Sequence, residues 1–90
     1  MRIAICDDEA RGRERIQTLL EKEFEQVQTR EFDSGMKLLA AVQEGYQPDI
    51  LLLDIAMEGM SGMETAGRIK ELSDVILIFV TGVKEQVFQA

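Results

Sequence analysis

Four short apolar runs divide the chain, and each one ends at a polar residue or a turn. Short apolar runs bounded in this way are typical of buried β-strands. The runs cover residues 2–6, 27–32, 50–53 and 75–80, and the second is the weakest because its apolar positions only loosely alternate. Apolar residues at consecutive positions indicate strands that are covered on both faces, as in a parallel sheet.

Between the runs, apolar residues recur at the three- and four-residue spacing of amphipathic helices. This spacing predicts helices over residues 9–24, from about 34 to 45 and from 61 to about 72, and a further helix that begins near Lys84. Residues that favour helix N-caps precede each of the first three helices. These residues are Asp8 for the first, Asp33 or Ser34 for the second, and Ser61 with Glu64 as a capping box for the third.

Strands and helices alternate along the whole chain, with connections short enough for crossover units. This order predicts an α/β fold with a doubly wound parallel sheet and helices on both of its faces. The sequence contains no internal repeat and no linker-like stretch. We therefore expect residues 1–90 to form one domain.

Composition narrows the chemistry that this domain can perform. The net charge is −7, from 17 acidic and 10 basic residues, which argues against direct binding to nucleic acid. The chain has no histidine and one cysteine, which excludes histidine-based catalysis and the usual zinc sites. Carboxylate chemistry with a hard cation such as Mg²⁺ remains. No apolar run is long enough to cross a membrane and the N-terminus lacks a secretory-signal layout, so we expect a cytoplasmic location.

Three of the predicted strands end at a residue with a carboxylate or hydroxyl side chain that could bind a ligand or take part in a reaction. These residues are Asp7 with Asp8, then Asp54, then Thr81. In open parallel sheets, ligands bind outside the carboxyl ends of the strands. Carboxylates that meet there need a cation, and one of them can then attack a phosphoryl group to form an aspartyl phosphate. Taken singly, each residue has a plainer interpretation as a helix cap or a solvated loop acid. Their joint placement at three strand ends favours a site.

The motifs around these strand ends resemble those of a bacterial two-component response-regulator receiver domain. They are ICDDE at 5–9, LLLDIAM at 51–57 followed by GMSG at 59–62, and FVTG at 79–82. The resemblance covers the whole chain, and its closing stretch is similar to receivers that carry LytTR-type DNA-binding outputs. The fold it implies is a flavodoxin-like receiver fold.

The resemblance also implies a role for each candidate residue. Asp54 matches the phosphoacceptor, and Asp7 and Asp8 match the acidic pair that holds Mg²⁺ together with Asp54. The backbone carbonyl of Ala56 is expected to complete the metal site, and the Thr81 hydroxyl to bind the phosphoryl group. The implied partners are a sensor histidine kinase and a downstream DNA-binding output domain in the full-length protein.

The chain departs from the receiver pattern in two respects. Receivers usually carry proline four residues after the phosphoacceptor, and this chain has Glu58 there. The fifth strand, the fifth helix and the catalytic lysine of the family have no counterpart in these residues, because Lys84 follows the fourth strand too soon. We expect the apolar edge left on the fourth strand to promote self-association or domain swapping of this chain.

Two other functions stay open from the sequence. A non-phosphorylated pseudo-receiver would keep the fold and act as a dimerisation module. A phosphatase of the haloacid dehalogenase type would also use a strand-end aspartate, but it needs a second aspartate where this chain has Ala56.

Two smaller features carry expectations of their own. We expect Cys6 to pack as a small buried apolar residue. The basic run Arg11, Arg13 and Arg15 is expected to form a solvated helix face, with docking of a phosphotransfer partner as the alternative.

Overall fold

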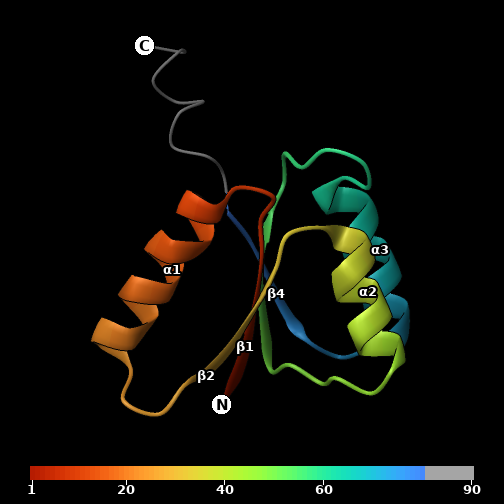
Figure 1. Cartoon of the computed structure of the whole chain (residues 1–90). Helices are drawn as coiled ribbons and strands as arrows, with labels where there is room; N and C mark the ends of the chain where they lie inside the picture. Colours follow the sequence, from red (N-terminus) through yellow and green to blue (C-terminus); the bar gives the residue numbers. More distant parts are fainter. Residues whose placement is uncertain (81–90) are drawn as a thin grey trace.

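Four parallel strands form the sheet at the centre of the computed structural model, which describes residues 1–80 (Figure 1). The strands are β1 (Arg2–Cys6), β2 (Gln28–Phe32), β3 (Ile50–Asp54) and β4 (Ile76–Val80). Their order across the sheet is β2-β1-β3-β4, and each neighbouring pair is parallel. The chain moves outward from β1 to β2 and then crosses to β3, so the strand order reverses between β1 and β3.

Three helices lie among the described residues: α1 (Ala10–Glu23), α2 (Gly35–Gln43) and α3 (Gly62–Leu72). Figure 1 shows α1 on one face of the sheet and α2 and α3 side by side on the other. The prediction of a doubly wound α/β fold is thereby confirmed. Within residues 1–80 the architecture is the receiver-like flavodoxin fold without its last strand and helix. The helix predicted to begin near Lys84 lies outside the described residues.

The helix caps follow the sequence signals in two of three cases. Of the two candidates before α2, Ser34 is the N-cap, and its hydroxyl accepts a hydrogen bond from the Lys37 amide at 3.2 Å. Ser61 caps α3 by accepting from the Glu64 amide at 3.1 Å. The Glu64 carboxylate pairs with Arg68, four residues along the same helix.

The predicted N-cap of the first helix is wrong. Glu9, not Asp8, occupies the N-cap position of α1, and it makes no side-chain capping bond. The Asp8 carboxylate instead accepts the backbone N–H of Glu58, which lies in the loop after β3. A long-range partner has therefore taken the side chain that a local pattern assigned to the helix.

The main hydrophobic core lies between the sheet and the pair α2–α3. Alternate residues of β1 and β3, such as Ala4 and Leu51, point toward this layer and pack against both helices. The buried members of this core cluster are Ala4, Cys6, Phe32, Leu38, Leu39, Ala41, Leu51, Leu53, Met57, Ala66, Ile69 and Val75. The buried position of Cys6 is as predicted.

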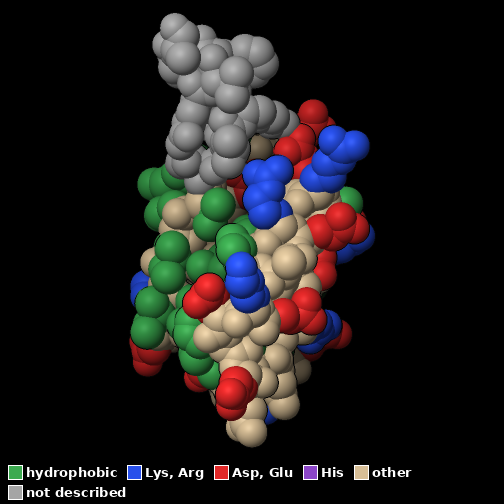
Figure 2. Space-filling view, turned by 90° about the vertical axis from the view of Figure 1, so that its left-hand side faces the viewer, with side chains coloured by type: hydrophobic (Ala, Val, Ile, Leu, Met, Phe, Trp, Pro, Cys, Tyr) green, Lys and Arg blue, Asp and Glu red, His purple; other side chains and the backbone are tan. Residues whose placement is uncertain are grey.

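The opposite face of the sheet is covered less completely. Ile3 and Ile5 are buried beneath α1, yet no residue of α1 is itself buried. Leu77 packs against the main core, so its neighbours Ile76 and Ile78 point to the α1 face, where they are 61% and 46% exposed. Figure 2 shows hydrophobic side chains gathered along one side of the face that carries α1. The edge strand β4 thus presents an apolar surface among the described residues.

Candidate metal centre

Three carboxylates meet at the carboxyl edge of the sheet. Asp7 and Asp8 follow β1, and Asp54 is the last residue of β3, the strand paired directly with β1. One oxygen of each carboxylate lies within 4.8 Å of the others. The predicted convergence of these three acids is therefore present in the fold, at the point where the strand order reverses.

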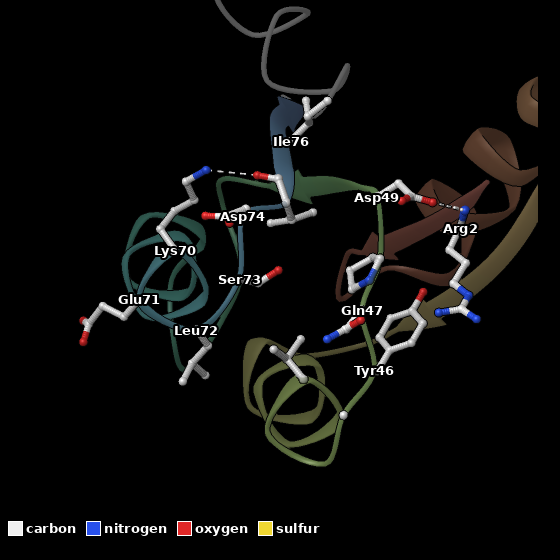
Figure 3. Close-up of a pocket in the computed structure, with 14 residues that line it drawn as sticks. Arg2, Tyr46, Gln47, Asp49, Lys70, Glu71, Leu72, Ser73, Asp74 and Ile76 are labelled. Carbon is white, nitrogen blue, oxygen red and sulfur yellow. Dashed lines mark hydrogen bonds between the residues drawn. The ribbon is translucent and has the colours of Figure 1, made fainter.

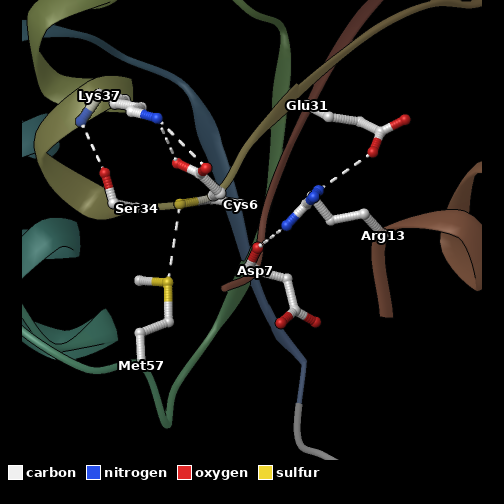
Figure 4. Close-up of polar contacts among 8 residues, drawn as sticks. Cys6, Asp7, Arg13, Glu31, Ser34, Lys37 and Met57 are labelled. Carbon is white, nitrogen blue, oxygen red and sulfur yellow. Dashed lines mark hydrogen bonds and ion pairs between the residues drawn. The ribbon is translucent and has the colours of Figure 1, made fainter. Parts of the chain in front are cut away.

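Asp7 is held from several directions. The residue is buried, with 8% of its surface exposed, and its Oδ1 accepts the Glu9 amide at 2.9 Å. Gly12 of α1 packs directly against this carboxylate, and a Cβ at position 12 would overlap Asp7 Oδ2. Arg13 Nη1 donates to the Asp7 backbone carbonyl at 2.7 Å, and Arg13 Nε pairs with Glu31 of β2 at 3.2 Å (Figure 4). The first acid of the cluster is thus positioned by β1, β2 and α1 together.

Arg13 corrects one expectation from the sequence. As part of a basic run it was expected on a solvated helix face, but its side chain is only 18% exposed because it folds back over the end of β1. Its neighbours in the run, Arg11 and Arg15, are exposed. A glycine inside a helix, at Gly12, was the available signal that something packs closely against this turn.

Asp54 sits half-buried at the end of β3, where its Oδ1 accepts the Ala56 amide at 3.2 Å. Burial of the carboxyl, followed by the nearby charge of Asp7, raises the pKa of Asp54 to about 6. Like charges at this distance disfavour ionisation of all three acids at once. A bound cation would reverse that effect, and an all-oxygen set of carboxylates is what Mg²⁺ prefers. The donor set and its electrostatics therefore fit a magnesium ion.

The structure does not test the predicted roles of the Ala56 carbonyl and of Thr81. The Ala56 backbone lies two residues beyond Asp54, and its amide is engaged by that carboxylate. A metal contact by the Ala56 carbonyl stays a prediction. Thr81 lies outside the described residues.

The loop between β3 and α3 is anchored near its middle and at its end. Near its middle, the Glu58 amide donates to Asp8 Oδ2 at 3.1 Å. At its end, the Gly62 amide donates to the Ile55 carbonyl at 3.1 Å, and a Cβ at position 62 would collide with the backbone of β3. The Glu58 bond uses a main-chain group, which side-chain patterns in the sequence could not reveal.

Beneath the site, two sulfur atoms meet in the core. Cys6 Sγ lies 3.8 Å from Met57 Sδ (Figure 4), and burial raises the pKa of the Cys6 thiol to about 12. A thiol held neutral in this way is a packing group and not a nucleophile at neutral pH. The contact links β1 to the loop that carries Glu58.

A cavity lies away from the acidic cluster, at the amino ends of the strands. It has a volume of about 820 Å³ and lies between the α2–β3 and α3–β4 connections (Figure 3). Arg2, Asp49 and Lys70 line it; the Arg2 backbone amide donates to the Asp49 carboxylate, and Lys70 Nζ donates to the Val75 carbonyl. The acidic cluster lies at the opposite end of the strands, so this cavity is separate from it. No helix within residues 1–80 is long and apolar enough to cross a membrane.

Comparison with known proteins agrees with this geometry. The family model of the response regulator receiver domain matches residues 3–90. The sensory transduction protein LytT of Oceanobacillus iheyensis is 36% identical over 98% of this chain, which spans 37% of that protein. The transcriptional regulatory protein YdfI of Bacillus subtilis is 32% identical over 93% of the chain, which spans 39% of that protein.

Solved structures share the fold as well. The N-terminal domain of a response regulator/sensory box/GGDEF protein from Carboxydothermus hydrogenoformans superposes with a TM-score of 0.84 at 29% identity, covering 90% of this chain and 64% of that one. The response regulator protein TrrA from Thermotoga maritima, solved in complex with Mg²⁺-BeF, gives a TM-score of 0.73 at 32% identity, covering 87% and 68%. The chain belongs to the response regulator receiver domain family of two-component signalling, whose members are not turnover enzymes.

Proposed function

We propose that this chain is a phosphoacceptor that takes a phosphoryl group from the phosphohistidine of a sensor histidine kinase onto Asp54. The observation that carries the proposal is the cluster of Asp7, Asp8 and Asp54, whose carboxylate oxygens lie within 4.8 Å of one another. These three carboxylates and the Ala56 backbone carbonyl would hold Mg²⁺.

The chemistry follows from the position of Asp54. One of its oxygens attacks phosphorus, the P–N bond to the donor imidazole breaks, and the electron pair of that bond returns to the imidazole. The product is an aspartyl phosphate. When bound, Mg²⁺ supplies positive charge that offsets the charge on the phosphoryl oxygens. Asp7 and Asp8 would hold the metal ion beside Asp54. The Thr81 hydroxyl would bind a phosphoryl oxygen.

The proposal also covers the domain to which these residues belong, the location of the protein and its output domain. We place residues 1–90 in one receiver domain of a cytoplasmic protein. The chain spans less than two-fifths of both LytT and YdfI, whose names describe sensory transduction and transcriptional regulation. We therefore propose a DNA-binding output domain in the full-length protein, with no contact to nucleic acid or membrane by this domain.

The exposed apolar surface of β4 favours the second candidate function, a pseudo-receiver that acts only through protein contacts. Intact mass measured after incubation with Mg²⁺ and acetyl phosphate separates the two. One added phosphoryl group that is absent in Asp54→Ala supports the phosphoacceptor. A parent chain that stays unlabelled, both alone and in a protein extended beyond residue 90, supports the pseudo-receiver.

A further inference from the structure

Each acid of the cluster accepts one backbone N–H. Asp7 takes the amide of Glu9 and Asp54 takes the amide of Ala56, both two residues further along the chain. These two bonds are local and form wherever an aspartate precedes a turn of this kind. Asp8 differs, because its partner, the Glu58 amide, is 50 residues away.

We infer that the backbone amide of Glu58 is a positioning group that orients the Asp8 carboxylate toward the bound cation, an inference that rests on the proposed magnesium site. Asp8 is exposed, so without a fixed partner its carboxylate would turn freely toward water. The 3.1 Å bond from Glu58 ties Asp8 Oδ2 to the β3–α3 loop, and one oxygen of Asp8 lies within 4.8 Å of an oxygen of Asp7 and of Asp54.

The amide of Glu58 carries this role, and its side chain does not. Among the described residues the group that could hold a metal comprises Asp7, Asp8 and Asp54 and does not include Glu58. Every residue except proline supplies the backbone N–H. Alanine at position 58 should therefore keep the function, and proline should remove it.

The same bond makes the loop responsive to the metal site. The loop begins at Asp54, passes through Glu58 and ends at Gly62, which is packed against the backbone of Asp54 and Ile55. The middle of the loop is tied to Asp8 through the Glu58 amide. Reorientation of the Asp8 carboxylate on metal binding would therefore move the Glu58 backbone.

Calorimetric titration of Mg²⁺ into the chain tests the inference with a matched pair of variants. We expect Glu58→Ala to bind Mg²⁺ within about twofold of the parent, and Glu58→Pro to bind about 3- to 10-fold more weakly, since an exposed charged hydrogen bond is lost. Equal affinity in the alanine and proline variants would overturn the inference alone. A parent chain that binds no Mg²⁺ would overturn the proposed function and the inference with it.

A second measurement separates positioning from mere damage to the loop. In an amide NMR spectrum of the metal-free protein, the Glu58 resonance should shift in Asp8→Ala and stay in place in Asp33→Ala, whose carboxylate pairs with Lys37 instead. A Glu58 resonance that is the same in the parent and in Asp8→Ala shows that the bond does not form, and the inference fails.

Discussion

Arg13 donates a 2.7 Å hydrogen bond from Nη1 to the backbone carbonyl of Asp7, the residue at which β1 meets the acidic cluster. Through its Nε the same guanidinium pairs with Glu31 of β2 at 3.2 Å. One side chain of α1 thus fixes the backbone of a residue in the acidic cluster and joins two strands. The bidentate use of the guanidinium explains why lysine would be a poor substitute.

Replacement of Arg13 by alanine should lower the free energy of unfolding by about 1–2 kcal/mol, because the Asp7 carbonyl loses a charged donor in a half-buried position. Urea denaturation measures this. Arg15→Ala removes an exposed arginine from the same helix and should change stability by less than about 0.5 kcal/mol. Equal losses in the two variants would contradict the assigned role of Arg13.

Alanine should stabilise the protein at one of two helical glycines and not at the other. A Cβ at Gly67 in α3 meets nothing within 4 Å, so Gly67→Ala should stabilise the protein by about 0.5–1 kcal/mol through helix propensity. A Cβ at Gly12 would overlap the Asp7 carboxylate, so Gly12→Ala should show no such gain and should change Mg²⁺ affinity. Thermal denaturation of both variants, with and without Mg²⁺, gives the comparison. A gain of the same size at both positions would show that Asp7 does not depend on Gly12.

The metal-free protein should become less stable as pH rises through the titration range of Asp54. The pKa of this carboxyl is about 6 in the folded chain against 3.8 as its ordinary value, so protonation favours the folded state. Its contribution to stability is present below pH 3.8 and is lost by the time the pH has passed about 6. The direction is opposite to that of an aspartate in an ion pair.

Asp54→Asn removes this ionisation and provides the test. In the presence of a chelator, it should be more stable than the parent above pH 6 by about 1 kcal/mol, after discounting for solvent screening at a partly exposed group. The advantage should shrink toward pH 4 and also on addition of Mg²⁺. Asp74→Asn, which removes a carboxylate outside the cluster, is the control. A pH-independent advantage of Asp54→Asn would argue against a strained acidic cluster.

The apolar surface on β4 should make the 90-residue chain self-associate. Ile76 and Ile78 are exposed on an edge strand, and such edges pair readily with other chains. Ile78→Lys should shift the mass measured by light scattering toward that of the monomer. Met36→Lys, at an exposed residue of α2 on the opposite face, should leave the parent's association unchanged. A monomeric parent chain at high concentration would refute this prediction.

The sequence predicted the parts of this structure that depend on local pattern. Apolar runs located all four strands to within a residue at each end, and serine hydroxyls marked the starts of α2 and α3. The meeting of Asp7, Asp8 and Asp54 followed from the strand ends once a parallel sheet was assumed. Side-chain types and their spacing were sufficient for these conclusions.

Residue types and their spacing could not predict interactions between segments that lie far apart in the sequence. Asp8 carries the sequence signal of a helix cap, but the Glu58 amide binds it instead, and a main-chain donor has no signature in residue type. Arg13 lies in a basic run that looks solvated, and only the packing of α1 over β1 turns it inward. Both errors arise because a tertiary partner outweighed a local preference.

The uneven covering of the two sheet faces has a consequence for how the molecule opens. Because α2 and α3 enclose the main core while α1 buries none of its residues, amide protons of α1 should exchange with solvent well before those of β1 and β3. Asp7 and Asp8 lie at the junction between these two regions. A cation bound there would join the labile layer to the protected one, so metal binding should slow exchange along α1, far from the ligands themselves.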